Sequence, residues 1–267
     1  MNHTPRSLIT FARMKQAGEP IAALTCYDAS FARLVDAAGV DLILVGDSLG
    51  MVLQGHNTTL SVTLDDMVYH TRCVARGTQQ ALIVADLPFL SYTTPAAALA
   101  AAQRLLGEGG AQMVKLEGGA DLCSIVSELT RFGVPVCAHL GLLPQSVHQL
   151  GGYRYQGRAE ADAERIRNDA LALQAAGASL VVLECIPAAL ATMLSQTLTI
   201  PTIGIGAGNG CDGQVLVLYD LLGISADQSP RFSRNFLNGQ PSIGAAIADY
   251  VTAVKQRTFP GAEHTLA

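Results

Sequence analysis

The sequence predicts an α/β fold, a (β/α)8 TIM barrel, and three observations lead to that expectation. Eight short apolar runs recur along the chain, and segments with helical patterning separate most of them. From Ile21 to Tyr219 the runs span 199 residues, about 25 per unit, close to the spacing in a barrel of roughly 250 residues. A doubly wound sheet is the alternative, but it needs only five or six strands, and the G-x-G-x-x-G turn after its first strand is missing. We therefore expect one domain over residues 1–267.

The barrel strands are expected at the eight apolar runs. Three runs share one pattern, in which a glycine precedes an apolar stretch that leads into an acid. Gly39, Gly110 and Gly177 stand where a helix would end in a left-handed residue, and the Val/Ile/Leu stretch after each is typical of a strand buried on both faces. These three runs lie at 37–47, 108–118 and 175–185, and the other five at 20–28, 80–88, 133–141, 200–208 and 214–220.

The intervening helices carry start signals. Thr63 and Asp66 have the spacing of a capping box, and Thr94 precedes Pro95 at the first position of a long Ala/Leu stretch. Pro187 opens another helical segment.

Three further segments lie outside this alternation. Residues 4–18 predict an amphipathic N-terminal helix that closes the floor of the barrel, and residues 241–257 predict a C-terminal helix. The glycines of 204–210 follow the seventh run with the wrong spacing for a nucleotide loop, so we expect a close-approach turn at the barrel mouth.

Composition excludes several classes of protein. Apolar residues make up 49% and charged residues 15%, which excludes intrinsic disorder, and the net charge of −5 without a Lys/Arg-rich run argues against a nucleic-acid partner. No stretch approaches the roughly 18 apolar residues that a membrane span needs. The first residues lack the apolar block of a secretory signal, so a cytoplasmic location is expected. Six cysteines without a CxxC pair then indicate reduced core thiols.

Charged side chains gather at the predicted carboxyl ends of the strands, the face where barrels of this kind carry their catalytic groups. One acid at the end of a buried strand is more often a helix cap or half of an ion pair, but four around one ring favour a functional site. The charged and titratable residues at these ends are Asp47, Asp86, Lys115, Glu117, His139 and Glu184.

A small cation is expected between two of these acids. Asp47 and Asp86 follow neighbouring strands, about 4.8 Å apart, so both carboxylates reach one ion. Oxygen ligands select Mg²⁺ over zinc, and one or two carboxylates suffice because Mg²⁺ keeps several positions for water or substrate oxygens. Glu117, one strand further on, is expected to bind through a water.

The remaining strand-end residues suggest a substrate site. Glu184 ends the sixth strand, opposite the second in a ring of eight, and without an evident arginine partner it suits general-base work. Lys115 either presents its charge to a substrate oxyanion or pairs with Glu117. His139 is expected as an orienting hydrogen-bond donor, and Ser48 either binds a substrate carboxylate or caps the next segment.

Several enzyme classes lack their motifs here. No GxSxG elbow, HExxH pair or P-loop occurs, so triad hydrolysis, zinc proteolysis and NTP hydrolysis are not expected. Metal-assisted chemistry on a small oxyanion, with a base, is the class that fits.

Seven motifs lie along nearly the whole chain: LVGDSLGMVLQGHNTTL (44–60), ADLPF (85–89), VKLEGG (114–119), HLGLLPQS (139–146), GGYRYQGR (151–158), VLEC (182–185) and IGIGAG (203–208). GDSLGM with a downstream ADLPF is a specific pair, and the other motifs follow in a fixed order. In these motifs and their order the chain resembles the ketopantoate hydroxymethyltransferase family, also called 3-methyl-2-oxobutanoate hydroxymethyltransferases.

This resemblance implies a reaction. A hydroxymethyl group passes from 5,10-methylenetetrahydrofolate to 3-methyl-2-oxobutanoate, giving 2-dehydropantoate for pantothenate and coenzyme A synthesis, through an enolate stabilised by Mg²⁺. Members of the family usually assemble as homodecamers, so a homodecamer is expected here. The other expected partners are the two small-molecule substrates.

The resemblance also implies residue roles, which agree with those expected from the strand ends. Asp47 and Asp86 match Mg²⁺ ligands that also meet the substrate, and Glu117 matches a ligand through water. Ser48 and Lys115 match groups that hold the keto acid. His139 matches a histidine of the pocket, and Glu184 matches the proposed base.

Two other functions are compatible with part of this pattern. The phosphoenolpyruvate mutase and isocitrate lyase group combines a barrel, metal-binding acids and 2-oxo acid chemistry, and would make the protein a carbon–carbon lyase. Its reactive-cysteine loop or phosphonate site has no counterpart in this sequence. A barrel that only binds an anion is the second, and Glu184 argues against it because a simple anion site should exclude a carboxylate.

Overall fold

The structure is a computed structural model that describes residues 5–224 and 230–265. Eight parallel strands form a closed barrel in sequence order, with the first strand paired to the eighth. The (β/α)8 barrel is therefore confirmed, and the doubly wound sheet is excluded. The strands are β1 (Ile21–Thr25), β2 (Leu42–Val45), β3 (Leu82–Asp86), β4 (Met113–Glu117), β5 (Val136–Gly141), β6 (Leu180–Glu184), β7 (Thr202–Ile205) and β8 (Gly213–Leu216).

Each strand lies within or close to its predicted run, and in the eighth run a helix takes the place of the second half of the expected strand. The run at 214–220 was expected as a strand throughout, but β8 ends at Leu216 and Leu218–Leu222 form the short helix α10. The glycines that precede three of the strands behave as expected, with φ of 85° at Gly39, 84° at Gly110 and 108° at Gly177.

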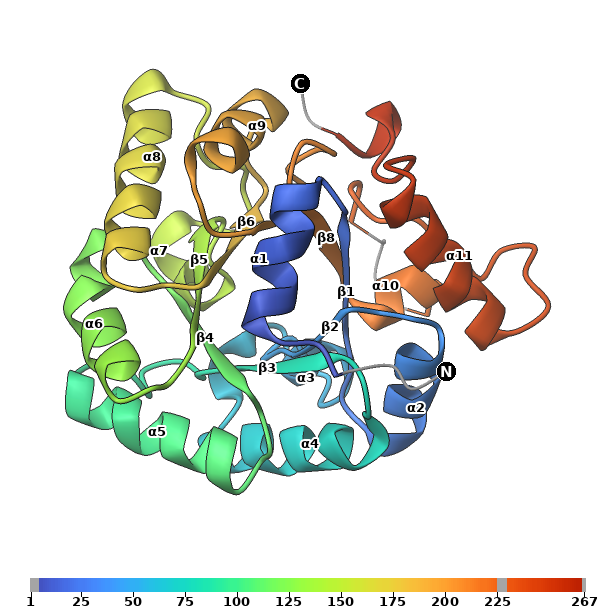
Figure 1. The fold of residues 1–267 in the computed structure, drawn as a ribbon, viewed down its shortest axis with the longest axis horizontal. Helices are drawn as coiled ribbons and strands as arrows, with labels where there is room; N and C mark the ends of the chain where they lie inside the picture. Colours follow the sequence, from blue (N-terminus) through green and yellow to red (C-terminus); the bar gives the residue numbers. More distant parts are fainter. Residues whose placement is uncertain (1–4, 225–229, 266–267) are drawn as a thin grey trace.

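Helices surround the barrel (Figure 1), and the expected start signals are present. Thr63 Oγ1 accepts from the Asp66 amide while the Asp66 carboxylate accepts from the Thr63 amide, and Thr94 caps the helix that begins at Pro95. Between the strands lie α2 (Ala29–Ala37), α3 (Leu49–Val52), α4 (Leu64–Gly77), α5 (Pro95–Gly107), α6 (Cys123–Arg131), α7 (Val147–Leu150), α8 (Glu160–Ala175) and α9 (Ala188–Thr197), with short 3₁₀ turns η1 (Thr59–Ser61), η2 (Ala120–Leu122) and η3 (Pro144–Ser146).

The apolar core has two layers, one inside the barrel and one between the strands and the helices. Helix α1 (Leu8–Ala17) crosses one end of the barrel (Figure 1) and places Phe11 and Met14 in the inner layer, so it closes the floor as expected. It begins at Leu8 because Ser7 caps it, later than the predicted start at residue 4, which lies outside the described residues. The C-terminal helix α11 (Ile243–Lys255) packs against β1 and α2.

Two expectations about the whole chain can be compared with the structure. Of the six cysteines, all free, four are buried, whereas Cys73 and Cys123 are half-buried, so the expectation of core thiols is wrong for those two. No helix in the described parts of the chain is both long and apolar enough to cross a membrane.

Candidate active site

Strand register brings four of the predicted side chains together at the barrel mouth. Asp86 on β3 pairs with Lys115 on β4, and Glu117 on β4 pairs with His139 on β5. Two residues before Asp86 and Lys115, Val84 and Met113 belong to the inner layer of the core. Because side chains alternate along a strand, all four polar residues point into the barrel.

Asp47 reaches the same cluster by a turn. Leu44 is in the inner layer and Val45 in the outer one, so continued alternation would point Asp47 away from the barrel interior. The strand ends at Val45, however, and the Asp47 amide donates to Asp86 Oδ2 at 3.1 Å. A Cβ on Gly46 would lie 2.8 Å from Ser48 Oγ, so a larger residue there would displace the Ser48 hydroxyl.

Lys115 lies beneath the acids. It is 3% exposed, and its Nζ lies 2.9 Å from Asp86 Oδ1 and 3.7 Å from Glu117 Oε1. It therefore points inward and is also ion-paired, with Asp86 rather than Glu117 as its closer partner. Burial opposes the charge of Lys115, but the negative charges of Asp86 and Glu117 outweigh it and raise the pKa of the amine.

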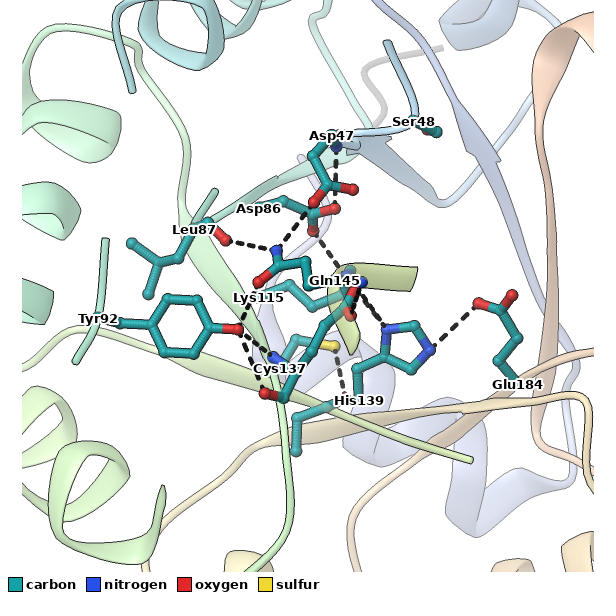
Figure 2. A network of polar contacts seen from close by, with 12 residues as sticks. Asp47, Ser48, Asp86, Leu87, Tyr92, Lys115, Cys137, His139, Gln145 and Glu184 are labelled. Atoms are coloured by element: carbon teal, nitrogen blue, oxygen red, sulfur yellow. Dashed lines mark hydrogen bonds and ion pairs between the residues drawn. The ribbon is translucent and has the colours of Figure 1, made fainter. Parts of the chain in front are cut away.

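His139 connects the acid cluster to Glu184. Its Nδ1 lies 3.4 Å from Glu117 Oε1, and its Nε2 lies 3.2 Å from Glu184 Oε2 (Figure 2). Burial and Lys115 disfavour the imidazolium, but the two carboxylates outweigh them and raise the pKa of His139 to about 9. His139 thus pairs with both carboxylates, and its contact with Glu184 is an ion pair without a well-directed hydrogen bond.

Glu184 differs from the other three acids in its exposure. Its side chain is 15% exposed, against 3% for Asp86 and 2% for Glu117, and Asp47 is also buried. Figure 2 shows it on the far side of His139 from Asp47 and Asp86. Among these acids, Glu184 is the one that a substrate could reach most readily.

Burial and mutual repulsion perturb the remaining acids. Burial, reinforced by the charges of Asp86 and Glu117, raises the pKa of Asp47 well above its ordinary value. Burial also raises the pKa of Asp86, although Lys115 opposes the shift. For Glu117, burial is outweighed by His139 and Lys115, which lower the pKa. Four carboxylates face two cations here, so a bound cation would offset the excess negative charge.

The donors suit a hard cation held by two carboxylates. Asp86 Oδ1 is buried without a well-directed hydrogen bond, its contact with Lys115 being an ion pair. Across the described residues, no three His, Cys, Asp or Glu side chains converge as a ready-made ligand set. A cation between Asp47 and Asp86 would therefore need water or substrate oxygens as well, which is how Mg²⁺ is commonly held.

Ser48 is half-buried beside Asp47. It occupies the cap position of α3, yet its side chain makes no capping hydrogen bond, so the helix-cap alternative is wrong. Its Oγ instead lies 2.9 Å from the Tyr27 hydroxyl, which comes from the end of β1.

Three polar residues of the site had not been singled out from the sequence: Tyr27, Tyr92 and Gln145. Gln145 Nε2 donates to Asp47 Oδ2 at 2.8 Å, and the Tyr92 hydroxyl donates to Gln145 Oε1 at 2.6 Å. Each of the three follows a strand on the carboxyl face of the barrel, and that position is the sequence signal that could have found them.

Solved structures with similar folds were found at low sequence identity. A putative phosphonomutase from Burkholderia cenocepacia J2315 superimposes with a TM-score of 0.64 at 18% identity, covering 81% of this chain and 94% of that one. A 2,3-dimethylmalate lyase of the PEP mutase/isocitrate lyase superfamily gives a TM-score of 0.59 at 18% identity, covering 82% and 83%. At this identity the likeness is one of fold.

Sequence relatives are much closer. The 3-methyl-2-oxobutanoate hydroxymethyltransferase of Methylobacillus flagellatus is 62% identical over 260 residues, 97% of this chain and 99% of that protein. The enzyme of the same name from Halorhodospira halophila is 59% identical over 265 residues, covering 98% and 96%. The family profile described as ketopantoate hydroxymethyltransferase matches residues 6–262. The chain therefore belongs to the ketopantoate hydroxymethyltransferase family.

Proposed function

We propose that this hydroxymethyltransferase uses Mg²⁺, held by Asp47 and Asp86, to move a hydroxymethyl group from 5,10-methylenetetrahydrofolate to C3 of 3-methyl-2-oxobutanoate, giving 2-dehydropantoate. Family membership over almost the full chain supports the reaction. The residue roles rest on one observation: at the barrel mouth Asp47 and Asp86 are buried, whereas Glu184 is more exposed. His139 lies between Glu184 and Glu117. The carbon–carbon lyase alternative is disfavoured because relatives about 60% identical share the hydroxymethyltransferase name.

Asp47 and Asp86 are the residues proposed to hold the cation directly, with Glu117 acting through a water. When bound, Mg²⁺ would draw electron density from the 2-oxo group and so favour loss of the C3 proton. Glu117 suits an indirect role because the Gln145 backbone N–H and the His139 ring already contact its two oxygens.

Glu184 is proposed as the base that takes the C3 proton. Its partial exposure allows a substrate to approach, and its contact with His139 Nε2 orients one carboxylate oxygen. The substrate carbon then forms its new bond to the one-carbon unit of the folate, and water supplies the hydroxyl group as tetrahydrofolate leaves. Because Glu184 and the acid pair lie on different sides of His139, proton removal is separated from cation binding.

Lys115 and Ser48 are proposed to hold the keto acid. Lys115 provides a fixed positive charge below Asp86, where it attracts substrate oxygens. Ser48 provides a hydroxyl beside Asp47, held in place by Tyr27.

Proton exchange tests the role of Glu184 without folate. In D₂O the wild-type enzyme, with Mg²⁺, should exchange the C3 proton of 3-methyl-2-oxobutanoate, as followed by proton NMR. Glu184→Gln keeps the shape but removes the base, so exchange should fall about 10²- to 10⁴-fold. Glu164→Gln, on the exposed face of α8, is the matched control. Undiminished exchange in folded Glu184→Gln would rule out Glu184 as the base.

Family resemblance also leads us to propose a homodecamer in the cytoplasm. Size-exclusion chromatography with light scattering should then give a mass ten times that of the 27.9 kDa chain. A monomer or dimer at enzyme concentrations used for assays would contradict the assembly.

A further inference from the structure

Gln145 connects the two sides of the acid cluster. It lies in η3, after β5, and is 5% exposed. Its backbone N–H donates to Glu117 Oε2 at 2.9 Å, while its side-chain Nε2 donates to Asp47 Oδ2 at 2.8 Å and to the Leu87 carbonyl at 2.9 Å (Figure 2). One residue thus contacts an acid that follows β2 and an acid on β4.

The surroundings allow only one orientation of this amide. The Nε2 side faces a carboxylate and a carbonyl, which are both acceptors, whereas Oε1 receives the Tyr92 hydroxyl proton at 2.6 Å. The Tyr92 oxygen in turn accepts from the Glu117 N–H at 3.3 Å. A reversed amide would bring its oxygen against both acceptors, so the hydrogen-bond network determines the assignment.

Asp47 depends on this contact more than Asp86 does. Asp86 is on a strand and its carboxylate also meets Lys115 and the Asp47 amide. Asp47 lies in the turn after β2, and within the described chain Gln145 is the one side chain that hydrogen-bonds its carboxylate. Holding Oδ2 leaves the other carboxylate oxygen of Asp47 for a ligand.

We propose that Gln145 is a positioning residue that orients the Asp47 carboxylate for cation binding and, through its backbone, keeps Glu117 alongside. This inference rests on the proposed Mg²⁺ site. Groups that orient a metal ligand commonly contribute 10- to 100-fold to metal affinity. A merely structural glutamine would contribute to folding but not selectively to that affinity.

Isothermal titration with Mg²⁺ alone tests the proposal on folded, metal-free protein. Gln145→Met keeps the length of the side chain and removes its donors, and should weaken Mg²⁺ binding about 10- to 100-fold. Gln145→Asn keeps an amide but is too short to span from Tyr92 to Asp47, so it should also weaken Mg²⁺ binding. It replaces Gln145→Met in the test if the Met variant does not fold. Gln214→Met is the matched control, because Gln214 is also 5% exposed and donates to the Gly208 carbonyl at 3.0 Å without contacting the acids.

The Mg²⁺ affinities of the wild type and the variants decide whether Gln145 positions Asp47. Weakened Mg²⁺ binding in the Gln145 variants, normal binding in Gln214→Met, and recovery of kcat at high Mg²⁺ support the proposal. Normal Mg²⁺ affinity in folded Gln145→Met or Gln145→Asn, or an equal loss in Gln214→Met, would overturn it. Absence of Mg²⁺ binding by the wild-type protein would instead refute the proposed metal site, and the inference with it.

Discussion

Replacing Lys115 by Met should destabilise the metal-free protein strongly, and the size of the effect follows from the ion pairs. Nζ lies 2.9 Å from Asp86 Oδ1 and 3.7 Å from Glu117 Oε1, with all three side chains at most 4% exposed. With an effective dielectric constant of about 20, the two attractions amount to about 6 and about 4.5 kcal/mol before desolvation is counted.

The net effect is smaller because the amine no longer has to be buried. Removing one partner of a buried ion pair typically costs about 3–5 kcal/mol, since the other charge is left uncompensated. For a protein of this size, such a loss corresponds to a fall in Tm of roughly 6–20 °C. Asp86 would also be released from its closest cation, so added Mg²⁺ should stabilise Lys115→Met more than it stabilises the wild type.

Urea unfolding followed by circular dichroism, in the presence of a chelator, measures the free energy of unfolding directly. Arg167→Met is the control, because Arg167 pairs with Glu164 on an exposed helix face and its loss should cost less than about 1 kcal/mol. If Lys115→Met lost no more than this control, the charges would be well solvated and the reasoning from a dry site would be wrong.

Three further outcomes are expected. Asp47→Asn should weaken Mg²⁺ binding, measured by calorimetry, and unchanged Mg²⁺ affinity would contradict the ligand role. The same variant should raise the free energy of unfolding of the metal-free protein at pH 7, because the raised pKa of Asp47 means that its charge is disfavoured in the fold. Thr63→Ala should cost about 1 kcal/mol in urea unfolding. The Thr63 hydroxyl also donates to the Asp66 carboxylate and lowers the pKa of Asp66. That part of the cost is present above the ordinary value of 3.8 and should shrink as pH falls below it, whereas a pH-independent difference would argue against this hydroxyl–carboxylate bond. Phe11→Ala should cost about 3–5 kcal/mol by opening a cavity at the barrel floor, and a loss under 1 kcal/mol would mean that α1 does not close it.

The barrel was predictable because its signals are local. Both-face-buried strands appear as continuous apolar runs, and helix starts appear as capping residues such as Thr63 and Thr94. The eighth run shows the limit of this reasoning, since Leu218–Leu222 are apolar enough for a strand but form a helix after β8 ends. Apolar character alone cannot distinguish a short buried helix from a strand.

The membership of the acid cluster was also accessible from the sequence. In a closed parallel barrel, every strand end lies on one rim, so Asp86, Lys115, Glu117 and His139 had to lie near one another once the strands were placed. Their pairing was less accessible, because the closer acid to Lys115 is Asp86 on the neighbouring strand and not Glu117 on its own.

The barrel and the set of charged residues on its rim therefore follow from the sequence alone, because strand period and strand ends depend on short stretches of chain. The three-dimensional fold was needed to show that Asp47 turns inward, that His139 contacts both Glu117 and Glu184, and that Gln145 and Tyr92 complete the cluster. These contacts join residues up to 98 positions apart, between Asp47 and Gln145. They form because loops from different strands converge at one face, and no local pattern records which loop atoms meet there.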